Sequence, residues 1–204
     1  FTCDQRLTHE AGPDGKFLYC LSNAAPWVMD RDIYDKYKLV SMVASNKGYT
    51  LGHQRRLKVV QEYFNKYGGD DLFGWGLPQE LPLKEKSRAL ADYMFSFAVE
   101  NANYPTYFTE KLTDCFACGT IPVYYGTIGV AQYFNPEGII FLDQNRPWEN
   151  IPWEKLTQEY YLSKKDAIVE NFNIAKEMRV AEDYMYANYL AQLDPIRNQR
   201  PVTV

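Results

Sequence analysis

The stretch that decides the fold is YMFSFAVENANYPTYFTEKLTDCFACGTIPVYYG, residues 93–126. It contains two largely apolar runs, at residues 94–99, where only Ser96 is polar, and at residues 121–124, and such runs are typical of strands that are buried on both faces. Between them, Thr109 suits the N-cap position of a helix, and Gly119 suits the left-handed position that ends one. A strand, a helix and a second strand in this order predict a crossover between parallel strands.

The same alternation of apolar runs and helical patterns continues on both sides of this stretch. The predicted elements are strands at residues 39–44, 71–75, 94–99, 121–124 and 139–142, and helices at residues 53–66, 84–92, 109–118 and 130–134. In the first helix, Leu57, Val60 and Phe64 recur at three- to four-residue spacing and predict its apolar face. The predicted fold class is therefore α/β, a Rossmann-like, doubly wound, mostly parallel sheet with helices on both faces.

The chain is predicted to divide into three parts. Residues 1–36 look irregular, with a strong turn signal at residues 12–15, and form a lead-in segment or the remnant of a preceding domain. Residues 37–150 hold the Rossmann-like sheet, and residues 151–204 form a tail of helices that pack on it. Because the sequence begins with Phe1 rather than Met, we expect a processed or excised piece of a longer protein.

Composition excludes several classes of protein. The chain has 204 residues, of which 46% are hydrophobic and 24% charged, so it is neither disordered nor collagen-like. Its formal net charge of −4 argues against nucleic acid or an anionic membrane surface as a partner, since both attract a broad cationic surface. No apolar run approaches the ~20 residues that cross a bilayer. A cytoplasmic protein of bacterial or viral type is predicted, with a Golgi enzyme that has lost its anchor as the alternative.

Cys115 and Cys118 form a C-x-x-C pair, which occurs in redox dithiols and in zinc sites. The pair falls late in a predicted helix, whereas thiolates are stabilised at a helix start. A zinc site would have to recruit distant ligands, namely Cys3, Cys20, His9 or His53. We therefore favour two small buried apolar residues, and we predict no metal site.

Two loops follow predicted strands at the edge of the sheet where such folds bind ligands. The first loop contains Asn46 and delivers Arg55 and Arg56 into the first turns of a helix. The second places Glu110 and Lys111 at the start of the helix after residue 109. A cation at the positive end of a helix costs roughly 0.3 to 1 kcal/mol, so Lys111 calls for a compensating anion, which a diphosphate would supply.

Less specific interpretations of these residues stay open. Arg55 and Arg56 could be solvated charges on the helix surface. Glu110 and Lys111 could pair with other side chains, although adjacent helical residues do not face one another. His53 could be a surface residue at a helix start, and Tyr104 and Tyr107 could pack where a loop meets the sheet. From the residues alone, the prediction is an α/β domain that binds an anionic ligand.

Three blocks resemble the signature of the α-1,3-fucosyltransferase family: SFAVEN at residues 96–101, YFTEKL at 107–112 and GTIPVYYG at 119–126. The continuation VAQYFNP, residues 130–136, resembles bacterial members, and the likeness spans roughly residues 38–143. One departure is Val99, where the family usually has Phe, and we interpret it as a change in packing.

The resemblance implies an architecture and a set of contacts. The family has the GT-B architecture, two facing Rossmann-like domains, of which this chain would be the C-terminal, donor-binding half. The donor is usually GDP-fucose. The donor contacts that the resemblance implies are Asn101, Tyr107, Glu110 and Lys111, with Arg56 facing the diphosphate, Arg55 as the alternative, and Asn46 and Glu100 as further candidates. Glu100 would face the transferring sugar or brace the site.

The resemblance also implies an inverting sugar transfer to a saccharide acceptor. Negative charge grows on the departing diphosphate, and Arg56, Lys111 and helix amides would stabilise it in place of a metal, so no cofactor is expected. The general base that activates the acceptor hydroxyl is expected in the N-terminal domain. Two alternatives are a transferase of the same fold that uses another sugar nucleotide, and a non-catalytic carbohydrate-binding module whose tyrosines stack on sugar rings.

Overall fold

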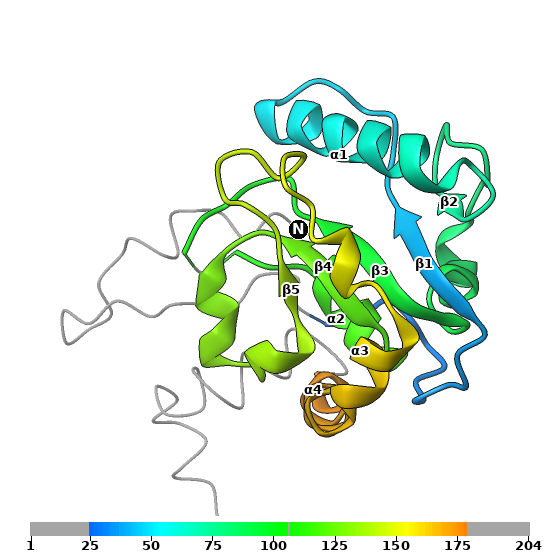
Figure 1. Cartoon of the computed structure of the whole chain (residues 1–204), viewed down its shortest axis with the longest axis vertical. Helices are drawn as coiled ribbons and strands as arrows, with labels where there is room; N and C mark the ends of the chain where they lie inside the picture. Colours follow the sequence, from blue (N-terminus) through cyan, green and yellow to red (C-terminus); the bar gives the residue numbers. More distant parts are fainter. Residues whose placement is uncertain (1–24, 106, 179–204) are drawn as a thin grey trace, which may run out of the picture.

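The structure, a computed structural model, describes residues 25–105 and 107–178. Its centre is a sheet of five parallel strands in the order β2-β1-β3-β4-β5 (Figure 1). The strands are β1 Lys38–Val43, β2 Leu72–Phe73, β3 Tyr93–Val99, β4 Ile121–Tyr125 and β5 Ile140–Phe141. The predicted doubly wound parallel sheet is therefore confirmed, and each strand lies within one or two residues of its predicted bounds.

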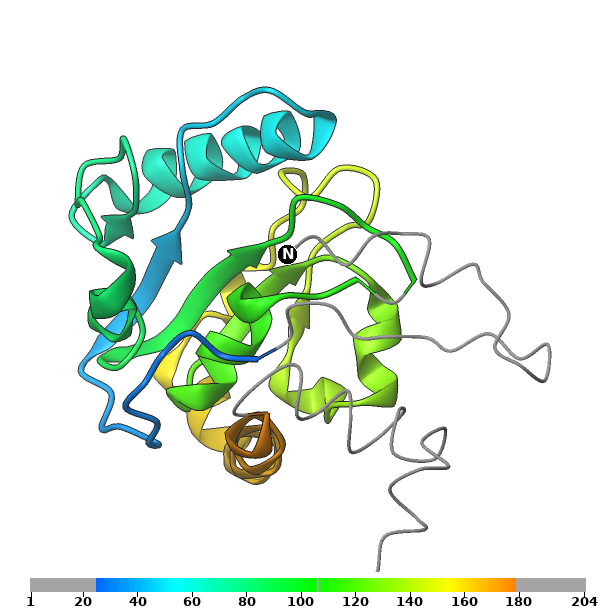
Figure 2. The ribbon, with the colours of Figure 1, turned by 180° about the vertical axis from the view of Figure 1, so that it is seen from behind.

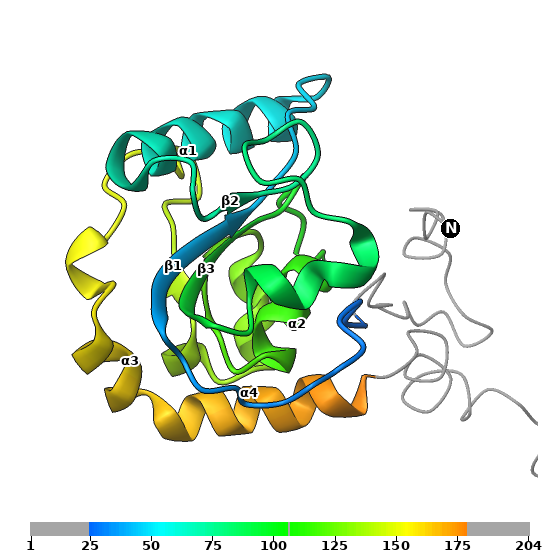
Figure 3. The same ribbon diagram turned by 90° about the vertical axis from the view of Figure 1, so that its right-hand side faces the viewer.

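Helices cover both faces of the sheet. The α-helices are α1 Leu51–Tyr67, α2 Glu110–Ala117, α3 Gln158–Ser163 and α4 Lys165–Glu177. Short 3-10 helices lie at η2 Leu83–Ala89, η3 Ile128–Gln132, η4 Pro136–Gly138 and η5 Trp153–Lys155. Figure 3 shows α2 and α3 on opposite sides of the central strands.

The central strand β3 separates two apolar cores. Phe97 packs against Tyr63 of α1 and Trp153 of η5, with ring centroids 5.5 and 5.7 Å apart. On the other face, Ala98 lies in a cluster with Leu112 of α2. All seven residues of β3 are buried, as expected for the central strand of a parallel sheet that is covered on both faces.

Helix α1 is turned relative to its predicted orientation. The structure buries Arg56, Val59 and Tyr63, whereas Phe64 is 47% exposed, so the face predicted from Leu57, Val60 and Phe64 is wrong by one residue. One residue corresponds to about 100° of rotation around a helix axis. Tyr63 explains the difference, because its ring fills the core while its hydroxyl donates a hydrogen bond to the Val40 carbonyl at 3.0 Å. The rotation carries Arg56 into the interior.

Two predicted helices take a tighter form than expected. The segment predicted as a helix over residues 84–92 is the 3-10 helix η2, which follows Pro82 and is interrupted by non-helical backbone at Glu85. The helix predicted over residues 130–134 is the 3-10 helix η3. The predicted cap at Gly119 is confirmed, because its φ of 66° lies in the left-handed region that glycine adopts without strain.

The two ends of the described chain meet on the α2 side of the sheet. Helix α4 packs across α2, and Ala175 and Met178 are buried in the core beneath it. Residues 25–37 pass beside α2, as Figure 2 shows, and Val28 is buried in the same core. The turn predicted at residues 12–15 and the part of the helical tail beyond residue 178 lie outside the described residues.

Cys115, in α2, and Cys118, the residue that caps its end, are buried free thiols, in agreement with the interpretation as small apolar residues. Burial raises the pKa of both thiols, that of Cys118 to about 12. Within residues 25–105 and 107–178, no cluster of three or more His, Cys, Asp or Glu side chains could hold a metal ion.

We predict that a thiol-reactive aromatic disulfide does not label Cys115 and Cys118 in the native protein at pH 8, because only the exposed thiolate attacks such a reagent. The test compares the wild type with the double variant Cys115→Ala and Cys118→Ala. Native samples should react equally, and the wild type should release two more equivalents after denaturation. Faster labelling of the native wild type would show that the pair is accessible and contradict the buried assignment.

Candidate functional site

Two helix starts adjoin at the carboxyl edge of the sheet. Helix α1 begins beyond β1 and helix α2 beyond β3, and these two strands are hydrogen-bonded neighbours. Gly52, in the first turn of α1, lies against the β3–α2 loop so closely that a Cβ there would be 1.7 Å from the Asn101 carbonyl oxygen. Glycine therefore permits the contact between the two loops that sequence analysis selected.

Arg56 is the buried cation of this site. The residue is only 4% exposed, and its Nη1 donates to Asn101 Oδ1 while its Nη2 donates to Ser45 Oγ at 3.0 Å. Among the described residues, its buried Nε has no hydrogen-bond partner, and no carboxylate pairs with the guanidinium. Burial lowers the pKa of Arg56. A buried charge without a counter-ion is costly, so the position favours a bound anion.

Lys111 already has its counter-ions, which corrects one inference from the sequence. Its Nζ lies 3.4 Å from Glu100 Oε2 and 3.3 Å from Glu110 Oε1. The cation at the start of α2 is thus compensated within the protein rather than by a ligand alone. Adjacent helical residues can meet here because the Lys111 side chain folds back over the helix end, where Thr109 Oγ1 accepts a hydrogen bond at 3.1 Å.

The charge state of this pair follows from opposing effects. Burial by itself lowers the pKa of Lys111, but the attraction of Glu100 and Glu110 outweighs it, and the pKa lies above its usual value. Burial raises the pKa of Glu100, which the Lys111 ammonium and the Thr109 hydrogen bonds oppose. Lys111 is therefore a cation at neutral pH.

Glu100 braces the start of α2. It is fully buried, and its Oε1 accepts hydrogen bonds from the Thr109 backbone N–H at 2.8 Å and from the Thr109 hydroxyl at 3.0 Å. With Lys111 on its other oxygen, the carboxylate is committed to the protein. Of the two roles predicted for Glu100, these contacts support bracing over contact with the transferring sugar.

Two tyrosines stand beside Glu100. Tyr107 is half-buried and packs edge-on against Tyr104, with ring centroids 6.4 Å apart. Tyr124, at the end of β4, has a buried hydroxyl without a hydrogen-bond partner among the described residues. Burial raises the pKa of both phenols, and the nearby Glu100 carboxylate raises it further. From the sequence, Tyr124 is predicted only as part of a strand, although its place two residues before Gly126 at the strand end is a signal for a site residue.

The remaining candidates lie around this centre. Arg55 is partly exposed, and its Nη1 donates to the Tyr125 hydroxyl at 2.9 Å. Asn46 lies on the β2 side of its loop, beside Gly76. The pKa of His53 is lowered by burial and then by the positive charges of Arg56, Lys47 and Lys111. Arg56 and Lys111 lie on the same side of the fold, because α1 and α2 start beyond the ends of the neighbouring parallel strands β1 and β3.

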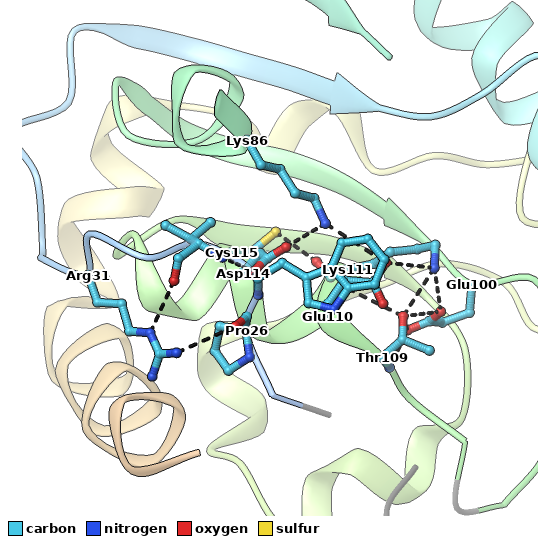
Figure 4. Close-up of polar contacts among 11 residues, drawn as sticks. Pro26, Arg31, Lys86, Glu100, Thr109, Glu110, Lys111, Asp114 and Cys115 are labelled. Carbon is cyan, nitrogen blue, oxygen red and sulfur yellow. Dashed lines mark hydrogen bonds and ion pairs between the residues drawn. The ribbon is translucent and has the colours of Figure 1, made fainter. Parts of the chain in front are cut away.

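A second group of buried charges lies beneath α2, and sequence analysis did not predict it (Figure 4). Lys86 of η2 forms an ion pair with Asp114 and lies 3.8 Å from Glu110 Oε1. Asp114 Oδ1 also accepts hydrogen bonds from the backbone N–H groups of Trp27 and Val28, at 2.6 and 3.0 Å. The available signal was Asp114, an acidic residue on the apolar face of a predicted helix, one turn after Glu110.

Comparison with known proteins gives a family match over the part of the chain that holds this site. Residues 33–147 match the family described as glycosyltransferase family 10 (fucosyltransferase), C-terminal part, and this range includes both loops. The chain belongs to this family. The resemblance on which sequence analysis relied is therefore confirmed over more than half of the chain.

Individual fucosyltransferases show the same relationship. The α-(1,3)-fucosyltransferase FucT of Helicobacter pylori is 31% identical over 90 residues, which is 44% of this chain and 19% of the relative. The α-(1,3)-fucosyltransferase 4 of Bos taurus is 36% identical over 93 residues, 45% of this chain and 22% of the relative. The matched part thus spans about a fifth of the length of these curated relatives.

Solved fucosyltransferase structures are also similar to the chain. A crystal structure of an α1,3-fucosyltransferase with GDP-fucose is 22% identical, with a TM-score of 0.48, over 76% of this chain and 48% of that one. A crystal structure of an α1,3-fucosyltransferase with GDP has the same TM-score of 0.48 to this chain.

Among the described residues, no helix combines the length and the apolar composition needed to cross a membrane.

Proposed function

We propose that this chain is the donor-binding part of a fucosyltransferase-like enzyme, which transfers fucose from GDP-fucose to a saccharide hydroxyl with inversion. The observation that carries the proposal is the buried guanidinium of Arg56, which has no carboxylate partner among the described residues and lies beside the start of α2. A diphosphate offers the charge that this guanidinium lacks, and an arginine fork matches phosphate geometry. Family membership supports the same choice of ligand.

Each candidate residue has a defined task in this proposal. Arg56 and Lys111 hold the diphosphate from two sides, and Asn101 orients the Arg56 guanidinium through its side-chain oxygen. Tyr107 hydrogen-bonds a phosphate oxygen, and Glu110 accepts from the ribose hydroxyls. As the bond to the sugar breaks, negative charge accumulates on the diphosphate. Fixed cations in a partly buried site stabilise that charge without reorganisation, and this lowers the barrier.

The general base is expected outside the described residues. It must be a carboxylate that reaches the acceptor hydroxyl from the face opposite the diphosphate. Glu100 and Glu110 are each within 3.4 Å of the Lys111 ammonium and therefore serve the donor side. We propose that a preceding domain supplies the base and selects the saccharide acceptor. The cytoplasmic location stays a prediction.

Calorimetry on the full chain tests this proposal. We expect GDP and GDP-fucose to bind more tightly than UDP or ADP, and we expect little fucose transfer to saccharide acceptors. Preference for another nucleotide diphosphate would assign the chain to a transferase with a different donor. Saccharide binding without any nucleotide binding would favour a carbohydrate-binding module and overturn the proposal. Efficient transfer would show that the base lies within the 204 residues.

A further inference from the structure

Lys86 is a buried cation that the proposed donor contacts do not include. The residue is 7% exposed, although η2, from which it projects, also carries the exposed Lys84 and Arg88. Its Nζ forms an ion pair with Asp114 and lies 3.8 Å from Glu110 Oε1, and Figure 4 shows the side chain directed at both carboxylates. Lysine is rarely buried unless it is paired, so these carboxylates fix its position.

Glu110 is shared between two ammonium groups. Its Oε1 lies 3.3 Å from Lys111 Nζ on the open side of α2 and 3.8 Å from Lys86 Nζ beneath it. The two lysines differ in access, because the Lys111 side chain is 21% exposed and the Lys86 side chain 9%. An anion that enters the site would therefore pair with the more exposed Lys111 ammonium, while Lys86 keeps its ion pairs with Asp114 and Glu110.

The position of Lys86 is fixed from behind by Asp114. That carboxylate is fully buried, and its other oxygen accepts the backbone N–H groups of Trp27 and Val28. The Lys86 ammonium also lies 5.1 Å from the centroid of the Trp27 ring. The ammonium is thus held between Asp114, Trp27 and Glu110, and it has little freedom to leave when the nucleotide binds.

We propose that Lys86 is a positioning residue for Glu110: it holds the Glu110 carboxylate in place to accept the ribose hydroxyls when the diphosphate of the donor engages Lys111. This inference rests on the proposed function and deepens it, because it assigns ribose recognition to a pair of residues rather than to Glu110 alone. Lys86 itself does not touch the nucleotide.

The test measures ribose discrimination, which a purely structural role would not change. The binding constants of GDP and of 2′,3′-dideoxy-GDP are compared by calorimetry, and their ratio reports the hydroxyl contacts alone. For the wild type we expect GDP to bind about tenfold more tightly, the scale of hydrogen bonds to a charged acceptor. In Lys86→Met this ratio should fall to about twofold or less. Lys86→Arg should restore most of it, and the exposed control Lys84→Met should leave it unchanged.

A double-mutant cycle assigns the effect to Glu110. In the Glu110→Gln background, which lacks the charge that Lys86 attracts, Lys86→Met should change the ratio no further. Lys86→Gln provides a second variant, because it keeps a hydrogen-bond donor for Asp114 and removes only the charge. If Lys86→Met does not fold, the same fall in the ratio is required of Lys86→Gln.

The outcomes separate this inference from the proposed function. A fall in the ratio that depends on Glu110 supports the positioning role. Equal loss of affinity for both nucleotides in Lys86→Met, or an unchanged ratio in a folded Lys86 variant, overturns it while leaving the donor assignment intact. Wild-type protein that binds GDP and its dideoxy analogue equally also overturns it. Failure of the wild type to bind GDP at all would overturn the proposed function as well.

Discussion

Replacement of Arg56 by methionine is expected to weaken GDP binding about 100-fold while leaving the apo protein at least as stable as before. The loss of affinity corresponds to about 2.7 kcal/mol, as expected for two charge-assisted hydrogen bonds to phosphate. Stability should not fall, because the variant removes a buried cation that has no carboxylate partner among the described residues. The hydrogen bonds lost to Asn101 and Ser45 offset part of this gain, so we expect the unfolding free energy to stay the same or to rise by up to about 1 kcal/mol.

These opposite effects distinguish a ligand-binding arginine from a structural one. Calorimetry with GDP and denaturant unfolding of the apo protein measure the two quantities. Arg55→Met is the matched control, since Arg55 is the next residue, is partly exposed and contacts the Tyr125 hydroxyl. It should change GDP affinity by less than about threefold. A strong loss of stability in Arg56→Met with unchanged GDP affinity would make Arg56 part of the scaffold rather than of the site.

Substitution of Gly52 by alanine is expected to destabilise the protein by about 3 kcal/mol and to weaken GDP binding more than tenfold. Helix propensity alone predicts the opposite, because alanine favours a helix over glycine by about 1 kcal/mol. In this structure the added Cβ would lie 1.7 Å from the Asn101 carbonyl oxygen, which belongs to the backbone of the neighbouring loop. The start of α1 or the β3–α2 loop must therefore move, and the movement separates Arg56 from Asn101.

Gly48 provides the control for this variant. A Cβ at Gly48 would make an ordinary contact, 3.5 Å from the end of the Leu57 side chain. Gly48→Ala should therefore change the unfolding free energy by less than about 0.5 kcal/mol. Thermal and denaturant unfolding with calorimetry on both variants decide the point. If Gly52→Ala unfolds like the wild type and binds GDP normally, the two helix starts do not touch as described.

Local patterns in the sequence were sufficient to predict the sheet. The apolar runs that became β3 and β4 are buried along their whole length, and that of β1 is buried over residues 40–42. A strand that is buried on both faces has few alternatives once helical segments separate it from the next. Gly119 marked the end of α2 because its left-handed backbone is intrinsic to glycine. Short elements were less predictable, since a 3-10 turn such as η2 and an α-helical turn have similar composition.

The site was predictable in its location and less so in its contacts. Strand-end loops meet at one edge of a parallel sheet whatever their side chains, so Arg56 and Lys111 could be brought together from topology. The ion pair between Lys111 and Glu100 could not be predicted, because Glu100 reaches Lys111 across a loop. The burial of Arg56 depends on which residue of α1 fills the core. Because Tyr63 is buried there and Phe64 is exposed, the helix is turned so that Arg56 faces the interior. Lys86 and Asp114 meet only through tertiary packing, which the local spacing of residues in the sequence does not predict.

The proposed donor site requires that Arg56 and Lys111, from two neighbouring helix starts, hold one diphosphate. A crystal structure of the chain with GDP tests it most directly. We predict that diphosphate oxygens lie within hydrogen-bonding distance of both the Arg56 guanidinium and the Lys111 ammonium, with the ribose directed at Glu110. A diphosphate bound elsewhere, with the guanidinium still in contact with Asn101, Ser45 and the Lys47 carbonyl, would contradict a shared diphosphate site.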